Sequence, residues 1–358
     1  MVFTDRYFSP HKLLLFINEL SGKFKVQLLG KSVKNSPIYG LKIGSGIKKV
    51  LIWSQMHGNE TTSARAVCRL IKYLLPSRSN LKNLQLFIIP QLNPDGAAAY
   101  SRFNANGVDI NRDALNLSQP ESKVLQKIFN EFQPDYCFNM HDQRSVFSAG
   151  DYEKASVISF LSPAIDKIKT ISTAREESML LVSEINKILQ KKVPGQVGRY
   201  NDQYNADCFG DKFSKRGVPT ILFEAGHSKK DYSRSFSKDL IFFSLKTALS
   251  SIINKKFLSG SHKDYFRIPE NRVKYVDIII NSATVVDKNI VYYDHQLAVQ
   301  YNEVLTKQSI FLQPTFHSHG KNLNLYCHSK INLDKNFESK EFIFEKNKII
   351  DISFFPKK

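Results

Sequence analysis

The chain has 358 residues, 42% of them hydrophobic and 23% charged, which is typical of a globular protein large enough for more than one folded unit. No stretch is long and apolar enough for a membrane span, and the segment 1–20 lacks a signal-peptide cleavage site, so we expect a cytoplasmic location and no membrane partner. The net charge of +18 comes from Lys and Arg spread along the chain without a nucleic-acid-binding motif, so we expect a basic surface that attracts anionic substrates, and no nucleic-acid partner.

Strand-like apolar runs alternate with helical patterns up to about residue 254. This alternation predicts an α/β fold with a mixed, largely parallel central sheet and helices on both faces. The predicted helices cover 7–20, 61–75, 121–132, 172–189 and 232–253, and the predicted strands cover 23–29, 38–43, 50–53, 84–89, 134–140 and 219–227.

The chain from residue 255 onward has a different pattern, with short strand-like runs separated by turns rich in Asn, Asp, Gly and Lys. We therefore predict a first domain over residues 1–254 and a small β-rich accessory domain over 255–358. The histidines of this second domain lack a carboxylate partner at a metal-binding spacing, so we expect them at the surface or partly buried. Its predicted strands cover 276–280, 290–293, 297–301, 309–312, 323–326 and 342–344, and its three histidines in this class are His317, His319 and His328.

The apolar run 50–53 ends in a turn that contains His57, Gly58 and Glu60, and a helix follows. Gly58 is expected to supply the turn. An imidazole and a carboxylate three residues apart can face one cation, and zinc accepts both kinds of ligand. By itself, the same pattern also fits a solvated helix start with a capping carboxylate.

Two further polar side chains follow predicted buried strands. His141 ends the strand 134–140, at a position equivalent to His57, and Asp142 beside it could orient a ring or a loop. Glu224 ends the strand 219–227, where a carboxylate is either a salt-bridged structural group or a general base. The carboxyl ends of parallel strands are where open α/β sheets bind ligands.

A polar, turn-rich segment over 100–113 contains Arg102, Asn111 and Arg112. Arg112 could bind a carboxylate with its bidentate fork, and Asn111 could add an amide donor. A salt bridge from Arg112 to Asp109 or Asp113 is the structural alternative.

Residues from about 50 to 250 resemble the zinc metallocarboxypeptidases of the carboxypeptidase A-like family. The interval from His57 to His141 is shorter than in the digestive members, which favours a compact bacterial-type member. The resemblance rests on five motifs in family order: His-x-x-Glu at His57 and Glu60, Asn-Pro-Asp-Gly at 93–96, Gly-Val-Asp-x-Asn-Arg at 107–112, a strand-end histidine at His141, and Phe-Glu at 223–224.

The resemblance implies one zinc ion per chain, held by His57, Glu60 and His141. It implies that Glu224 is the general base and that Arg102 stabilises the oxyanion. Its remaining implications concern the substrate: Asn111 and Arg112 would bind the terminal carboxylate, Tyr204 or Tyr200 would lie over the substrate, and Asp207 or Asp211 would select a basic or diamino side chain.

The expected function is that of a zinc metallocarboxypeptidase, which removes the C-terminal residue of a peptide such as a murein peptide or an isopeptide. Its partner would be a peptide or amino-acid amide with a free carboxylate. One alternative is an N-acyl amino acid deacylase of the aspartoacylase or succinylglutamate desuccinylase type. Another is a non-catalytic binding module on a peptidase fold.

Overall fold

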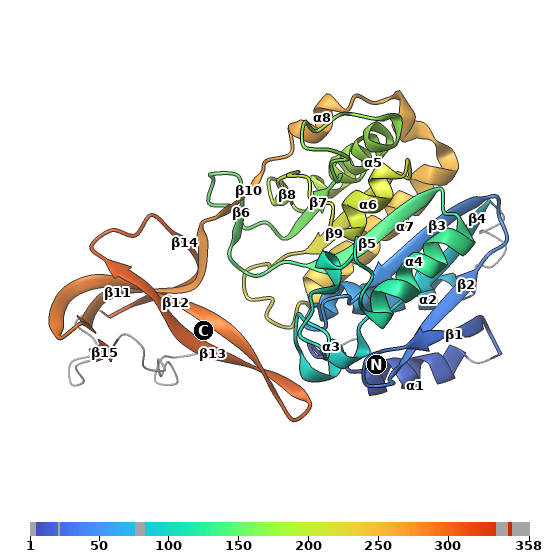
Figure 1. The fold of residues 1–358 in the computed structure, drawn as a ribbon. Coiled ribbons are helices and arrows are strands. Elements are labelled where there is room, and N and C mark those ends of the chain that lie inside the picture. Colours follow the sequence, from blue (N-terminus) through green and yellow to red (C-terminus); the bar gives the residue numbers. More distant parts are fainter. Residues whose placement is uncertain (1–4, 21, 76–82, 334–342, 346–358) are drawn as a thin grey trace.

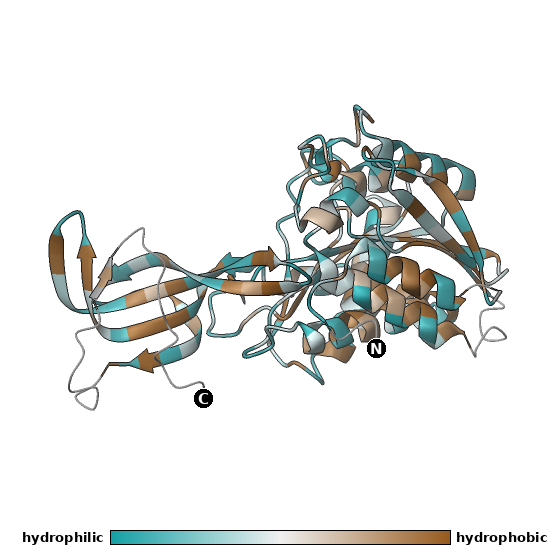
Figure 2. Ribbon diagram, turned by 90° about the horizontal axis from the view of Figure 1, so that it is seen from below, coloured by the Kyte–Doolittle hydropathy of each residue, from teal (hydrophilic) through white to brown (hydrophobic). Residues whose placement is uncertain are grey.

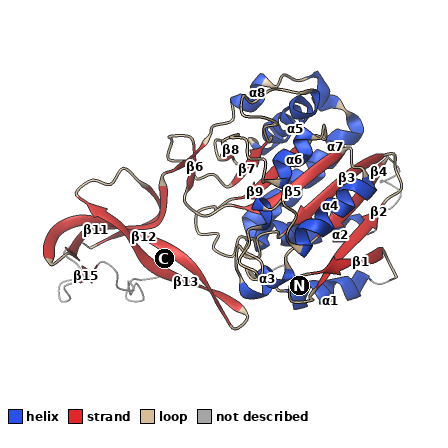
Figure 3. Cartoon of the chain, viewed as in Figure 1, coloured by secondary structure: helices blue, strands red, loops and turns tan. Residues whose placement is uncertain are grey.

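The computed structural model describes residues 5–20, 22–75, 83–333 and 343–345. It consists of an α/β unit and an elongated sheet formed by the C-terminal part of the chain (Figure 1). Figure 3 shows that helices are concentrated in the first unit, whereas the C-terminal extension consists of strands and loops. Among the described residues, every helix is too short or too polar to cross a lipid bilayer.

The α/β unit is built on an eight-stranded mixed sheet, as expected. The four central strands β4, β3, β5 and β9 are parallel to one another, and β1, β2 and β7 run antiparallel to their neighbours. In spatial order the strands are β1 (Lys25–Lys31), β2 (Pro37–Ile43), β4 (Leu84–Ile89), β3 (Lys48–Ser54), β5 (Tyr136–Asp142), β9 (Thr220–Ala225), β7 (Ile158–Leu161) and β8 (Val197–Arg199).

Helices cover both faces of this sheet. Successive residues of β3 therefore enter two different cores: Ile52 packs with the helices of one face, and Trp53 packs with those of the other, where its ring lies 5.6 Å from that of Phe213. Burial on both faces explains why β3 has no polar alternation. The first face is covered by α1 (Pro10–Leu20), α2 (Thr61–Leu74), α5 (Thr173–Leu189) and α7 (Ser235–Asn254), and the second by α4 (Pro120–Phe132) and α6 (Phe209–Lys215).

The C-terminal sheet has its own apolar core, visible as brown bands along its strands in Figure 2. Its central strand β11 pairs with β12 on one side and with β14 and β15 on the other. Its strands are β11 (Tyr275–Asp287), β12 (Ile290–Thr306), β13 (Ser309–Gly320), β14 (Tyr326–Asn332) and β15 (Ile343–Glu345).

The segment between α7 and β11 packs on the α/β unit. The hydroxyl of Tyr265 accepts a hydrogen bond from the amide of Ser162 at 3.0 Å, and a short strand pairs with another from the first unit. The proposed division at residue 254 stays a prediction, and this segment lies at its edge. Its elements are η3 (Lys256–Ser259), α8 (Lys263–Phe266) and β10 (Asn271–Val273), of which β10 pairs with β6 (Phe147–Ala149).

The structure differs from the predicted elements in several places. The predicted strands 290–293 and 297–301 form one long strand, interrupted at Asp294, whose φ of 53° produces an irregularity that looks like a turn in the sequence. The predicted strand 323–326 instead begins at Tyr326, and residue 342 of the last predicted strand lies outside the described residues. The helix α6 and the short strands β6, β7, β8 and β10 were not predicted.

Candidate active site

Three neighbouring parallel strands bring their carboxyl ends together at one edge of the sheet. His141 in β5 lies directly opposite Glu224 in β9 in the strand register. His57 follows the end of β3, which pairs with β5 on its other side. The parallel arrangement therefore collects side chains that are far apart in the sequence.

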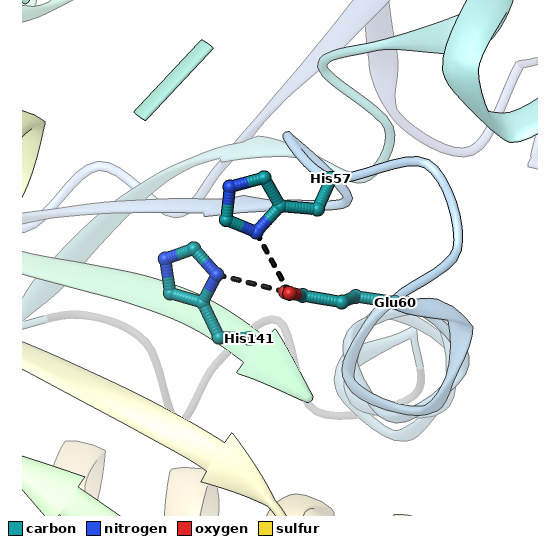
Figure 4. A group of neighbouring side chains, drawn as sticks. All are labelled: His57, Glu60 and His141. Atoms are coloured by element: carbon teal, nitrogen blue, oxygen red, sulfur yellow. Dashed lines mark hydrogen bonds and ion pairs between the residues drawn. The ribbon is translucent and has the colours of Figure 1, made fainter. Parts of the chain in front are cut away.

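His57, Glu60 and His141 converge on one point (Figure 4). The two oxygens of Glu60 lie 2.7 Å from Nδ1 of His57 and 2.8 Å from Nδ1 of His141. One ligand atom from each residue lies within 4.8 Å of the others, and all three residues are buried. Two imidazoles and one carboxylate in this arrangement fit the three-ligand set of a catalytic zinc site.

Asp109 supports this group from behind. Its Oδ1 lies 2.9 Å from Nε2 of His57, so the hydrogen of that ring is held on Nε2 and the lone pair of Nδ1 faces Glu60. Its Oδ2 accepts a hydrogen bond of 2.9 Å from Nε of Arg102, whose Nη1 lies 3.7 Å from Glu60. The sequence analysis considered Asp109 only as a partner of Arg112, although its position in the Gly-Val-Asp motif could have identified it.

The loop that bears His57 is fixed by two close contacts. A Cβ atom on Gly58 would lie 1.9 Å from the backbone of Gly96, so glycine is required here because two backbones approach each other closely. Asp142 accepts hydrogen bonds from the amides of Thr62 and Ser63 at 2.6 and 2.8 Å, at the start of α2. Asp142 therefore orients the helix that follows Glu60.

The protein environment separates the pKa values of the two glutamates. Burial raises the pKa of Glu60, but the two histidines outweigh it and hold that pKa well below its usual range. Burial raises the pKa of Glu224 well above its usual range, and the negative charges of Glu60 and Asp142 add to the effect. Carboxylates with opposite pKa shifts in one cleft are typical of a catalytic site.

The two histidines also differ. Burial opposes the charge of His57, but Glu60 and Asp109 outweigh it, so the pKa of His57 is raised. The pKa of His141 is lowered, first by burial, and Glu60 does not fully compensate. A bound divalent cation would replace the proton between each imidazole and Glu60.

These residues line a cavity of about 950 Å³ that also contains Arg102, Asn111 and Arg112. Arg112 is exposed and donates hydrogen bonds to its neighbour's carbonyl at 2.7 Å and to Sγ of Cys208 at 3.1 Å. The alternative that it pairs with a nearby aspartate is not supported, because Asp109 contacts His57 and Arg102 and Asp113 accepts hydrogen bonds in its own loop. The side-chain oxygen of Asn111 accepts a hydrogen bond from the amide of Phe209 at 3.1 Å.

The structure places the tyrosine and aspartate candidates unequally. Tyr200 and Tyr204 both line the cavity, and burial together with the charges of Glu224 and Glu60 raises the pKa of Tyr200 well above its usual range. Asp211 lines the cavity, and burial raises its pKa to about 6. Asp207 lies outside that lining, and its backbone carbonyl accepts a hydrogen bond from Ala114.

The C-terminal sheet forms part of the cavity wall, which the sequence did not predict. Tyr301, Asn302 and Glu303 of β12 are among its lining residues. Glu303 accepts hydrogen bonds from Arg6 at 2.7 Å and from the hydroxyl of Tyr100 at 2.5 Å. This charged contact attaches the sheet to the α/β unit beside the candidate metal ligands.

Comparison with known proteins gives a consistent result. The family described as zinc carboxypeptidase matches residues 15–187. Carboxypeptidase 2 of Trichophyton rubrum is 28% identical over 109 residues, which are 29% of this chain and 20% of that protein. Carboxypeptidase SOL1 of Arabidopsis thaliana is 29% identical over 133 residues, 31% of this chain and 27% of that protein. The chain therefore matches only about a fifth to a quarter of the length of these relatives.

Similar folds occur among solved structures. A metallo-carboxypeptidase from Burkholderia cenocepacia aligns with a TM-score of 0.57 at 15% identity, over 70% of this chain and 71% of that chain. A metallo-carboxypeptidase from Pseudomonas aeruginosa, in complex with (2-guanidinoethylmercapto)succinic acid, aligns with a TM-score of 0.56 at 18% identity, over the same shares of the two chains. At these identities the alignments establish the fold.

Proposed function

Because residues 15–187 carry a domain of the zinc carboxypeptidase family, we propose that this protein is a zinc metallocarboxypeptidase that removes the C-terminal residue of a peptide. The observation that carries the proposal is the convergence of His57, Glu60 and His141, with Glu224 in the same cavity. A binding module would not need a buried carboxylate of raised pKa beside a three-ligand metal set.

In the proposed reaction, a bound zinc ion supplies Lewis acidity, which polarises the scissile carbonyl and makes water acidic enough to attack at neutral pH. Glu224 accepts a proton from the attacking water and passes it to the leaving amine. The raised pKa of Glu224 makes it a stronger base than an exposed glutamate. Arg102, held by Asp109, is the proposed donor to the developing oxyanion.

Arg112 and Asn111 are the proposed anchor for the terminal carboxylate of the substrate. Arg112 has the planar donor fork that binds carboxylates in two places, and both residues line the same cavity as the metal ligands. Binding the terminal charge at a fixed distance from the metal would select the last peptide bond. Tyr204, or Tyr200 with its hydroxyl near Glu224, is proposed to cover the bound residue.

For the side chain of the departing residue, we propose a cationic or diamino group. Asp211 supports this more directly than Asp207, because its carboxyl group lines the cavity. The Pseudomonas aeruginosa structure was solved with a guanidino compound that also carries a succinic acid group. A murein peptide or an isopeptide that ends in a diamino acid would satisfy this chemistry.

The decisive experiment compares Glu224→Gln with the wild type on short peptides and on N-acyl amino acids, with zinc content measured on the same samples. We expect kcat on peptides to fall by about 10²–10⁴, while zinc remains bound, because Glu224 is not among the metal ligands. Glu131→Gln is the matched control, since that side chain is 60% exposed on α4.

Either of two results would contradict the proposal. Unchanged peptide turnover in Glu224→Gln would remove Glu224 as the base. Hydrolysis of N-acyl amino acids by the wild type, without any peptide cleavage, would indicate a deacylase instead.

A further inference from the structure

A second group of metal-binding side chains lies where the C-terminal sheet meets the α/β unit. His227 follows β9, Asp277 lies in β11 and His328 lies in β14. One ligand atom from each lies within 4.8 Å of the others, and all three residues are buried. We propose that His227, Asp277 and His328 form a second binding site for a divalent metal ion, zinc by the chemistry of its ligands.

His227 provides the strongest evidence. Its side chain is buried, with 2% of the residue exposed, and within the described part of the chain neither of its ring nitrogens has a hydrogen-bond partner. A buried imidazole without partners is unfavourable, because both its donor and its acceptor have lost water. Burial, followed by the charge of Arg234, lowers its pKa, so the ring is neutral and has a lone pair for a metal.

His328 is held in the tautomer that a metal requires. Its Nε2 lies 2.8 Å from the backbone carbonyl of Ser145, and a carbonyl can only accept a hydrogen bond. The ring hydrogen therefore stays on Nε2, and Nδ1 keeps its lone pair. This arrangement, in which a backbone carbonyl orients a ligand histidine, is common behind metal sites.

Asp277 is a buried carboxylate that is held by neutral donors. The hydroxyl of Tyr232 donates at 3.0 Å, the amide of Tyr301 donates at 2.8 Å, and the side chains of Gln300 and Ser145 also donate to it. These contacts fix the orientation of the carboxylate without neutralising it, and a buried charge is favourable only when it is paired. A metal ion between the two histidines would supply the positive charge.

The nearby arginines are engaged elsewhere. Arg6 pairs with Glu303 at 2.7 Å and lies 3.8 Å from Asp142. Arg234 donates to the backbone carbonyls of Gln143 and Gly226. An ion at the second site would join the loop after β9 to β11 and β14, and would therefore stabilise the junction that forms part of the cavity wall.

The test uses a His57→Ala, His141→Ala double variant, in which the first site has lost both histidines. The protein is dialysed against zinc, and bound zinc is measured by mass spectrometry. The same variant is then loaded with Co²⁺ and examined by absorption, because tetrahedral coordination by nitrogen and oxygen ligands gives distinctive visible bands. We expect about one zinc per chain and a higher melting temperature in its presence.

Adding His227→Gln or Asp277→Asn to this background should abolish the bound zinc, the Co²⁺ bands and the shift in melting temperature. Adding His317→Gln, an exposed histidine of β13, should change none of them. Far-UV circular dichroism checks that each variant is folded. The Co²⁺ spectrum of the double variant tests the site without any change to the three proposed ligands.

The inference is wrong if the folded double variant binds no zinc and gives no tetrahedral Co²⁺ spectrum. It is also wrong if His227→Gln keeps the same zinc content as its parent. These results are independent of the proposed peptidase activity. Loss of the first site would appear instead as a wild type and a double variant with equal zinc contents.

Discussion

Asp211 should lower the stability of the folded protein at neutral pH, and Asp211→Asn should remove that effect. The carboxyl group lies in α6, and the residue is 6% exposed. Burial raises its pKa to about 6, against the hydrogen bond of 3.0 Å that it accepts from the amide of Asn205. Asparagine can accept the same hydrogen bond but cannot ionise.

The sign and the size follow from linkage. An aspartate of the unfolded chain loses its proton near pH 3.8, whereas Asp211 in the folded protein loses it near pH 6. Between these values the unfolded state binds fewer protons, so stability falls as the pH rises through this window. The two pKa values differ by about 2.2, and about 1.4 kcal/mol per pKa unit gives about 3 kcal/mol above pH 6.

The assay is thermal unfolding of wild type and Asp211→Asn in the presence of a chelator, from pH 4 to pH 8. The variant should melt at nearly the wild-type temperature near pH 4 and on the order of 5–10 °C higher at pH 8. Asp207→Asn is the control, because its carboxyl group lies outside the cavity lining. A difference in melting temperature that stays constant over this pH range would refute the reasoning.

Three further predictions follow from the site. Asp109→Asn should weaken zinc binding by about 10–100-fold, measured by chelator competition, because Nε2 of His57 loses its carboxylate partner; an unchanged affinity would contradict this role. Glu303→Gln should cost about 1–2 kcal/mol above pH 5, because ion pairing lowers the pKa of this carboxylate to about 2 while its side chain is 29% exposed; this stability is lost as the pH falls toward 2, so urea unfolding of the two proteins should converge in acid. Gly58→Ala should lose zinc binding, since the new methyl group overlaps the backbone of Gly96, and a variant that folds and binds zinc normally would disprove the close contact.

The sequence was sufficient for the features that depend on local pattern. Continuous apolar runs with polar ends identified the strands β3, β5 and β9, because a strand buried on both faces cannot alternate with polar residues. The motif series was sufficient for His57, Glu60 and His141 as a group, which the structure brings together. The zinc carboxypeptidase resemblance, the α/β fold and the expected zinc ligand chemistry were confirmed.

The tertiary structure decided everything that depends on contacts between distant segments. Asp109 became the support of His57 because a loop folds back over the strand ends, and no local spacing encodes that approach. Gly58 is required by the backbone of Gly96, which the sequence separates from it by a helix and a strand. The cluster around His227 depends on the docking of a second sheet, which brings His328 into a buried position where the sequence indicated a surface or partly buried histidine. Strand and helix patterns reflect the burial of each segment, whereas the partners that bury it are chosen only when the whole chain packs.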